Sequence, residues 1–181
     1  MSRRAFRPLL HRPLVQVLLA GGIALFIVAL AVFEPWKLVI DRTIDESPPG
    51  VSESVTTFID GPMAPVVLAR GQLVSHEHAS TGTVVVMRLA DNSRVLRLED
   101  LRTSDGPLLR VWLAAAPVTE GRDGWYVFDD DRHVDLGELK GNIGSSNYPL
   151  PPDVDLAALP SVTIWCDRFN VSFAAAALKP E

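Results

Sequence analysis

The first strong pattern in the sequence is an uninterrupted apolar segment near the N-terminus. Residues 14–33, LVQVLLAGGIALFIVALAVF, carry no formal charge, and Gln16 is their only strongly polar side chain. A helix rises about 1.5 Å per residue, so a segment of this length spans roughly 30 Å, the thickness of the hydrocarbon core of a bilayer. A helix also satisfies its own backbone hydrogen bonds, as lipid requires. The pattern therefore predicts one transmembrane helix.

After about residue 65 the pattern changes to short runs of alternating or β-branched residues. The runs GTVVVMRLA and VLRLEDL are separated by the turn formers Asn92 and Ser93, which predicts an antiparallel hairpin. Further strands are predicted in LLRVWLA, WYVF, VDLGELKG and between Val162 and Leu178, and a long connection is predicted in NIGSSNYPLPPDVD. No 3.6-residue period is sustained in this part. The predicted fold class is all-β, a compact antiparallel β-sandwich or barrel-like domain preceded by one N-terminal transmembrane helix.

The charges that flank the apolar segment predict its orientation. Basic residues precede it and mixed charges follow it: Arg3, Arg4, Arg7 and Arg12 before, and Glu34, Lys37, Asp41 and Arg42 after. Positive flanks stay in the cytoplasm, so we expect a single-pass protein of the cell membrane with a cytoplasmic N-terminus and an extracytoplasmic C-terminal domain. A cleaved signal peptide is the alternative, because Ala29–Ala31 fits a cleavage site. The apolar run is longer than in most signal peptides, which favours an uncleaved signal-anchor.

These patterns divide the chain into four segments. We expect a basic cytoplasmic leader over residues 1–13, the transmembrane helix over 14–33, a linker or stalk over 34–65, and the exported β domain over 66–181. The stalk mixes Pro, Gly, Ser and acidic residues and has no sustained period. Its apolar residues Val55, Phe58 and Ile59 predict that part of it packs on the domain.

The exported part is acidic and contains one cysteine. The whole chain has a net charge of −5, and the arginines of the leader conceal a more negative remainder. We therefore expect no nucleic-acid binding, and contact with membrane lipid only through the N-terminal helix. A lone cysteine excludes a disulfide within the chain, so in an oxidising compartment the fold must depend on a hydrophobic core.

The single cysteine, Cys166, lies in the apolar stretch SVTIWCDRFNVSF. Ile164 and Cys166 share one face of the predicted strand, but the step from Cys166 to Phe169 changes the phase. A β-bulge or a tight turn at Asp167-Arg168 would restore inward pointing. One interpretation is a small buried hydrophobe in a core strand. The other is a functional thiol, which Arg168 would favour in its ionised form and Asp167 would oppose.

Four segments of the chain resemble the signature blocks of one family. They are GQLVSHEHASTGTVVV, RLEDLRTSDGPLLRVWL, DLGELKGNIGSSNYPLP and VTIWCDRFNVSFAAAAL. In this order and spacing they resemble the DM-thirteen domain, described as an electron-transfer domain, over about residues 66–179. The resemblance implies a compact β domain in which Cys166 occupies the position of the cysteine proposed to act as a bare thiol or to hold a prosthetic group. It also places His78, four residues before Gly82, at the family's H…G element.

The residues limit the redox chemistry. There is no C-x-x-C-H for covalent haem, no set of four cysteines for an iron–sulfur cluster, and no G-x-G-x-x-G after a strand. A bare thiol, a thiolate–haem ligand and a mixed Cys/His metal site remain. His76 and His78 would face the same side of a strand, and with Cys166 and Met87 they supply the donor types of a blue-copper site. The alternative is a solvated polar edge strand. The cofactor is left open, with haem or copper as alternatives.

The leading hypothesis is a membrane-anchored, extracytoplasmic domain with an electron-transfer role centred on Cys166 and a protein redox partner. The rival is a non-enzymatic β module that binds a partner or an envelope component and in which Cys166 is structural. The residues leave open whether the protein is an enzyme. The acidic run Asp129–Asp131 lacks the spacing of an EF-hand and predicts a solvated turn.

Overall fold

The computed structural model describes residues 13–50 and 64–181. The chain forms two compact units, Met1–Trp36 and Lys37–Glu181, which are described separately. Most of the described part of the first unit is helix α1 (Pro13–Phe33), and it has no buried residue. Its mean hydropathy of 2.6 and its length are those of a membrane span or of a signal sequence. The predicted apolar helix is confirmed, and the basic residues that were used to orient it lie outside the described residues.

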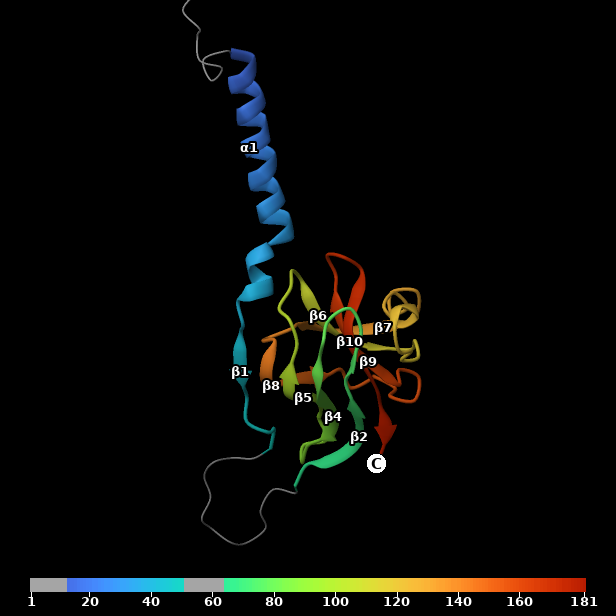
Figure 1. Ribbon diagram of the computed structural model, residues 1–181. Coiled ribbons are helices and arrows are strands. Elements are labelled where there is room, and N and C mark those ends of the chain that lie inside the picture. The colour runs from blue at the N-terminus through green and yellow to red at the C-terminus, as the bar shows by residue number, and fades with distance from the viewer. Residues whose placement is uncertain (1–12, 51–63) are drawn as a thin grey trace, which may run out of the picture. The chain divides into compact units, whose positions relative to one another are not determined.

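The second unit is a β-sandwich of two sheets, which confirms the predicted fold class (Figure 1). The first sheet has the order β1-β8-β5-β4-β2-β11, and the second has the order β3-β10-β9-β6-β7. The strands of the first sheet are β1 (Thr43–Asp45), β8 (Ile143–Leu150), β5 (Arg94–Arg102), β4 (Thr81–Arg88), β2 (Val66–Gln72) and β11 (Lys179–Pro180). Those of the second sheet are β3 (Val74–Ser75), β10 (Val171–Ala177), β9 (Ser161–Cys166), β6 (Leu109–Ala114) and β7 (His133–Glu138). Two short helices, η2 (Pro35–Val39) and η3 (Arg122–Gly124), complete the described elements.

The predicted hairpin is the pair β4–β5, which is antiparallel with Arg88 opposite Arg94. Asn92 adopts a positive φ of 63° in the connecting turn, a conformation that asparagine tolerates better than most residues. The Asp91 carboxylate accepts hydrogen bonds from the backbone N–H and the hydroxyl of Ser93 at 2.9 and 2.6 Å. The turn chemistry in the sequence therefore sets this register.

The main core lies between the two sheets and is built by alternation along the strands. Val84, Val86, Leu96 and Leu98 come from the first sheet, and Val111, Leu113, Val162, Ile164 and Cys166 come from the second. All of these side chains are 0% exposed, and Phe173 beside them is 2% exposed, so the core is closely packed. This core replaces the disulfides that the sequence lacks.

Two predicted elements differ from the structure. The stretch predicted as a long connection contains β8, a central strand whose Tyr148 is buried and accepts a hydrogen bond from the Lys140 N–H at 3.1 Å. The glycines and serines of β8 are typical of a loop, so the sequence did not predict a strand there. In the structure Ser145 and Ser146 are buried small polar residues of that strand. Conversely, the segment WYVF predicted as a strand lies in the connection between β6 and β7, where Phe128 packs over the second sheet instead of pairing.

Part of the predicted stalk belongs to the sandwich. Strand β1 pairs in parallel with β8, and a Cβ on Gly144 would come within 2.0 Å of the Ile44 carbonyl oxygen, so glycine permits this close approach. The Arg42 guanidinium makes two hydrogen bonds of 2.9 Å to the buried Asp105 carboxylate, and Asn142 accepts from the Arg42 N–H at 2.6 Å. The apolar stalk residues expected to pack on the domain (Val55, Phe58, Ile59) lie outside the described residues, and the four-segment division stays a prediction.

Candidate functional site

Cys166 ends strand β9 in the centre of the second sheet. It pairs with Leu109 of β6 and with Val171 of β10, and its side chain is 0% exposed. Its Sγ–H donates to the Pro107 carbonyl oxygen at 3.3 Å. The predicted phase change is a tight turn over residues 167–170, after which the register resumes at Val171. Phe169 lies in that turn and is 48% exposed, so it does not share the inward face.

The surroundings of Cys166 keep its thiol protonated. Burial raises the pKa of Cys166, and the negative charges of Glu77 and Asp167 raise it further. The backbone N–H groups of Phe169 and Arg168 oppose that rise. Arg168 therefore acts on the sulfur through its main chain, whereas the sequence suggested its side-chain charge. A protonated, covered thiol is a poor nucleophile, because the thiolate is the reactive form.

His76 and His78 follow β3 in a bend, so they are not on a strand as the sequence predicted. His76 is 7% exposed, and its Nδ1 lies 2.7 Å from the Ser172 hydroxyl, which in turn lies 2.8 Å from the Thr163 hydroxyl. The His78 ring packs on Phe173 with centroids 3.9 Å apart. The bend thus gives the two imidazoles different partners.

Among the described residues, Cys166, His76 and His78 are not brought together as one ligand set. In residues 13–50 and 64–181, no group of three or more His, Cys, Asp and Glu side chains is arranged to hold a metal ion. Met87 is outside the core cluster that contains Cys166, and its neighbour Val86 on β4 is inside it, so Met87 faces the other side of the first sheet. The sulfur of Cys166 is enclosed by core side chains and already donates to Pro107. A prosthetic group on this sulfur does not fit the packing, and the ligand role of His76 and His78 stays a prediction without a formed ligand set.

The outer face of the second sheet has a second, smaller cluster that the sequence analysis did not anticipate. Trp112, Trp165 and Phe128 pack there with alanines of β6 and β10, under the connection between β6 and β7. The indoles of Trp112 and Trp165 stack with centroids 5.1 Å apart and an interplanar angle of 24°. The His133 ring stacks on Trp112 at 4.0 Å and 9°. Phe128 meets Trp165 edge-on at 6.5 Å. No local sequence motif predicts this cluster, because its members come from three strands and a connection.

The same face contains buried nitrogen atoms without a hydrogen-bond partner. Among the described residues they include His76 Nε2 and Trp112 Nε1. Burial lowers the pKa of His76, and the Thr119 carbonyl opposes this shift although it makes no well-formed hydrogen bond to Nε2. His76 is therefore held as a neutral imidazole at neutral pH. Its hydrogen-bonded chain to Ser172 and Thr163 is a packed, polar part of the outer face.

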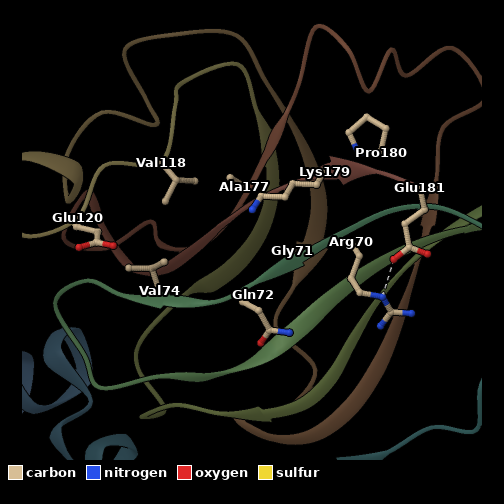
Figure 2. A pocket seen from close by; sticks show the side chains of 10 residues that line it. All are labelled: Arg70, Gly71, Gln72, Val74, Val118, Glu120, Ala177, Lys179, Pro180 and Glu181. Atoms are coloured by element: carbon tan, nitrogen blue, oxygen red, sulfur yellow. Dashed lines mark hydrogen bonds and ion pairs between the residues drawn. The ribbon is translucent and has the colours of Figure 1, made fainter.

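An open pocket of about 510 Å³ lies away from these groups, at the edge formed by β2, β11 and the end of β10 (Figure 2). Its lining residues are Arg70, Gly71, Gln72, Val74, Val118, Glu120, Ala177, Lys179, Pro180 and Glu181. Arg70 donates across it to the Glu181 carboxylate at 3.1 Å. Neither Cys166 nor the stacked tryptophans line this pocket, so the thiol is not a pocket residue.

Comparison with known proteins gives one match. A family model described as electron transfer DM13 matches residues 72–178, which is more than half of the chain. The matched range begins at the end of β2 and ends after β10, so it includes the second sheet and most of the core. No curated protein and no solved structure matches the chain.

Proposed function

Because this chain belongs to the electron transfer DM13 family, we propose that it is a membrane-anchored, extracytoplasmic electron-transfer module in which the Cys166 thiol is the redox centre. The observation that carries the proposal is the place of Cys166 within the family match. It is the single sulfhydryl of the chain, and burial raises its pKa although two backbone N–H groups of the following turn oppose that rise.

The burial of Cys166 limits which chemistry the proposal allows. Disulfide exchange and metal capture need a sulfur that a second molecule can touch, and this one is 0% exposed. An electron can pass through packed protein without such contact. The proposed role is therefore one-electron exchange across the protein matrix and not attack by a surface thiolate: a separate redox protein accepts the electron, and the S–H proton is released to solvent.

The anchor and its orientation are also part of the proposal. Helix α1 has the length and apolarity of a span, and the arginines before it favour a cytoplasmic N-terminus. Protease treatment of intact cells tests this topology. We expect the β domain to be cleaved from intact cells while a cytoplasmic marker survives. Cleavage only after lysis would place the domain on the cytoplasmic side.

Protein-film voltammetry of the full-length chain in detergent tests the redox centre. We expect a thiol-dependent current that is lost in Cys166→Ala and kept in Ile164→Val, a neighbouring core substitution that leaves the sulfur in place. The cost of one methylene group, about 1 kcal/mol, keeps the control folded. A current of the same size in Cys166→Ala would remove Cys166 from the electron-transfer path.

A second function is supported by the packing of Cys166. Its full burial, its hydrogen bond to Pro107 and its raised pKa are also the properties of a structural cysteine. In that case the domain is a non-enzymatic module that binds a partner or an envelope component. Cys166→Ala would then lower stability and leave partner binding unchanged, and the purified chain would give no thiol-dependent current.

A further inference from the structure

Three stacked rings connect the surface of the second sheet to its interior. They come from three adjacent strands: His133 from β7, Trp112 from β6 and Trp165 from β9. Exposure falls along the series, from the exposed His133 through Trp112 at 6% to Trp165 at 0%. Their centroids are 4.0 and 5.1 Å apart, and both contacts are stacked. The series is thus a continuous π contact from solvent to the centre of a strand.

We propose that Trp112 and Trp165 form a one-electron relay, with the surface at His133 as the place where a redox partner exchanges electrons with the domain. This inference rests on the proposed electron-transfer function but does not require Cys166. Indole is among the side chains most easily oxidised by one electron, and the probability of electron tunnelling falls exponentially with distance. Stacked rings in van der Waals contact therefore favour transfer between Trp112 and Trp165.

The steps balance without a proton acceptor. A one-electron oxidant of the metal-centre class takes one electron from Trp112 and is reduced, which leaves an indole cation radical. Trp112 then takes one electron from Trp165, so the cation radical lies on the buried ring. A one-electron reductant of the same class then donates one electron, which passes through Trp112 to the Trp165 cation radical and restores the neutral indole. Among the described residues, Trp112 Nε1 has no hydrogen-bond partner, so no base is placed to remove its proton during the transfer.

The charges beside the stack suit a transient positive charge. Arg110 lies opposite Trp165 in the β6–β9 pairing, where an unpaired guanidinium would oppose oxidation of the indole. That guanidinium is paired with the Asp135 carboxylate on β7. The exposed run Asp129–Asp131 precedes His133, and with Arg132 between them it leaves a net negative charge next to the entrance. A cationic oxidant is therefore favoured at this face.

The experiment uses the full-length chain in detergent, with Trp36→Phe and Trp125→Phe so that Trp112 and Trp165 are the remaining indoles. The oxidant is tris(bipyridine)ruthenium(III), generated by a laser flash with a cobalt(III) ammine as quencher. Transient absorption and electron paramagnetic resonance follow the tryptophan radical. We expect a radical whose lifetime shortens on the order of tenfold in Trp165→Phe, because the hole stays near the surface, where it is lost faster. We expect Trp112→Phe to lower the yield by about the same factor.

A surface substitution tests the entrance without touching a buried residue. His133→Ala uncovers the outer face of Trp112, so the oxidant can reach the indole directly and the radical yield should rise. Tyr126→Phe, at an exposed position, is the matched control and should leave the tryptophan radical unchanged. An unchanged yield in His133→Ala, or a full yield and lifetime in folded Trp112→Phe, would overturn the relay.

Cys166→Ala in the same background separates this inference from the proposed redox centre. We expect the tryptophan radical to form with unchanged yield, because the Trp165 side chain lies on the other face of β9 from the sulfur. A radical that persists while the voltammetric current disappears would support both proposals. A current without a relay radical would leave Cys166 as the centre and overturn only the relay.

Discussion

The two faces of strand β9 bury their side chains in different ways. The inward face carries Val162, Ile164 and Cys166 into a core that the first sheet covers. The outward face carries Thr163 and Trp165, which are also 0% exposed, into an aromatic and polar layer covered by a connection. The inward face is uniform and apolar, whereas the outward face contains hydroxyls, imidazoles and indole nitrogens.

This difference gives the two faces different electrostatic surroundings. The apolar interior encloses the Cys166 thiol among packed side chains, and burial raises the pKa of that thiol. The outward layer has stacked rings that reach the surface at His133 and a neutral buried His76. If the two faces are equally well packed, truncating a large side chain on either face should lower the free energy of unfolding by a similar amount. Changes of pH and the loss of a hydrogen bond should affect the two faces differently.

The largest effect is expected from removing a large ring from either face. Trp165→Ala and Phe173→Ala should each lower the free energy of unfolding by about 3–5 kcal/mol, because both rings are at most 2% exposed and leave a cavity. Chemical denaturation of the full chain measures both. A cost for Trp165→Ala below about 1 kcal/mol would show that the outward layer is only a loose cover.

Loss of a buried hydroxyl should affect the outward face alone. Ser172→Ala leaves His76 Nδ1 and the Thr163 hydroxyl without their shared partner, and should cost about 1–3 kcal/mol. Thr163→Val in the same background closes a double-mutant cycle. A coupling energy near zero would mean that the three groups do not act as one network.

The acid side of the stability profile should depend on the outward face. The pKa of His76 is lowered below its ordinary value of 6.5 by burial, so the unfolded chain binds more protons than the folded one in the window below 6.5. Stability should therefore fall as pH decreases through that window, with a slope of at most about 1.4 kcal/mol per pH unit from this group. His76→Gln should flatten this part of the profile relative to the parent chain. The same slope in both proteins would contradict the assignment.

The alkaline side should depend on the inward face, with the smallest effect. The pKa of Cys166 is raised above its ordinary value of 9.0 by burial, so above pH 9.0 the unfolded chain loses the proton that the folded chain keeps. Stability should decrease as pH rises there. Cys166→Ala should remove this decrease at a constant cost on the order of 1 kcal/mol for the lost sulfur. If the alkaline decrease persists in Cys166→Ala, the thiol is not its source.

The inward face was predictable from the sequence and the outward face was not. Alternation in VLRLEDL and LLRVWLA puts Leu96 and Leu98, and likewise Val111 and Leu113, on one face of their strands, and all four lie in the core. The phase change after Cys166 predicts the turn that follows β9. These features depend on neighbours along one strand. The stack of His133, Trp112 and Trp165 depends on the order of β7, β6 and β9, which no local pattern specifies.

The dependence on neighbouring strands also explains why β8 was not predicted and why WYVF was predicted as a strand. Strand β8 is poor in β-branched residues and is held by its position between β1 and β5, where Gly144 allows β1 to approach. The run WYVF has the composition of a strand but lies in the connection between β6 and β7, where Phe128 covers Trp165 instead. Tertiary context overrides strand propensity in both places. The prediction that His76 and His78 share one face assumed that both lie on a strand. Strand β3 ends at Ser75, before either histidine.

Because Cys166 is enclosed in the folded domain, its sulfur can report on events that precede folding. Two chains become joined through this atom only while β9 and the turn after it are still open, since the finished sandwich hides it completely. A covalent dimer recovered from cells would thus mark molecules that met before they finished folding, and its abundance on a non-reducing gel would report how quickly newly made chains fold.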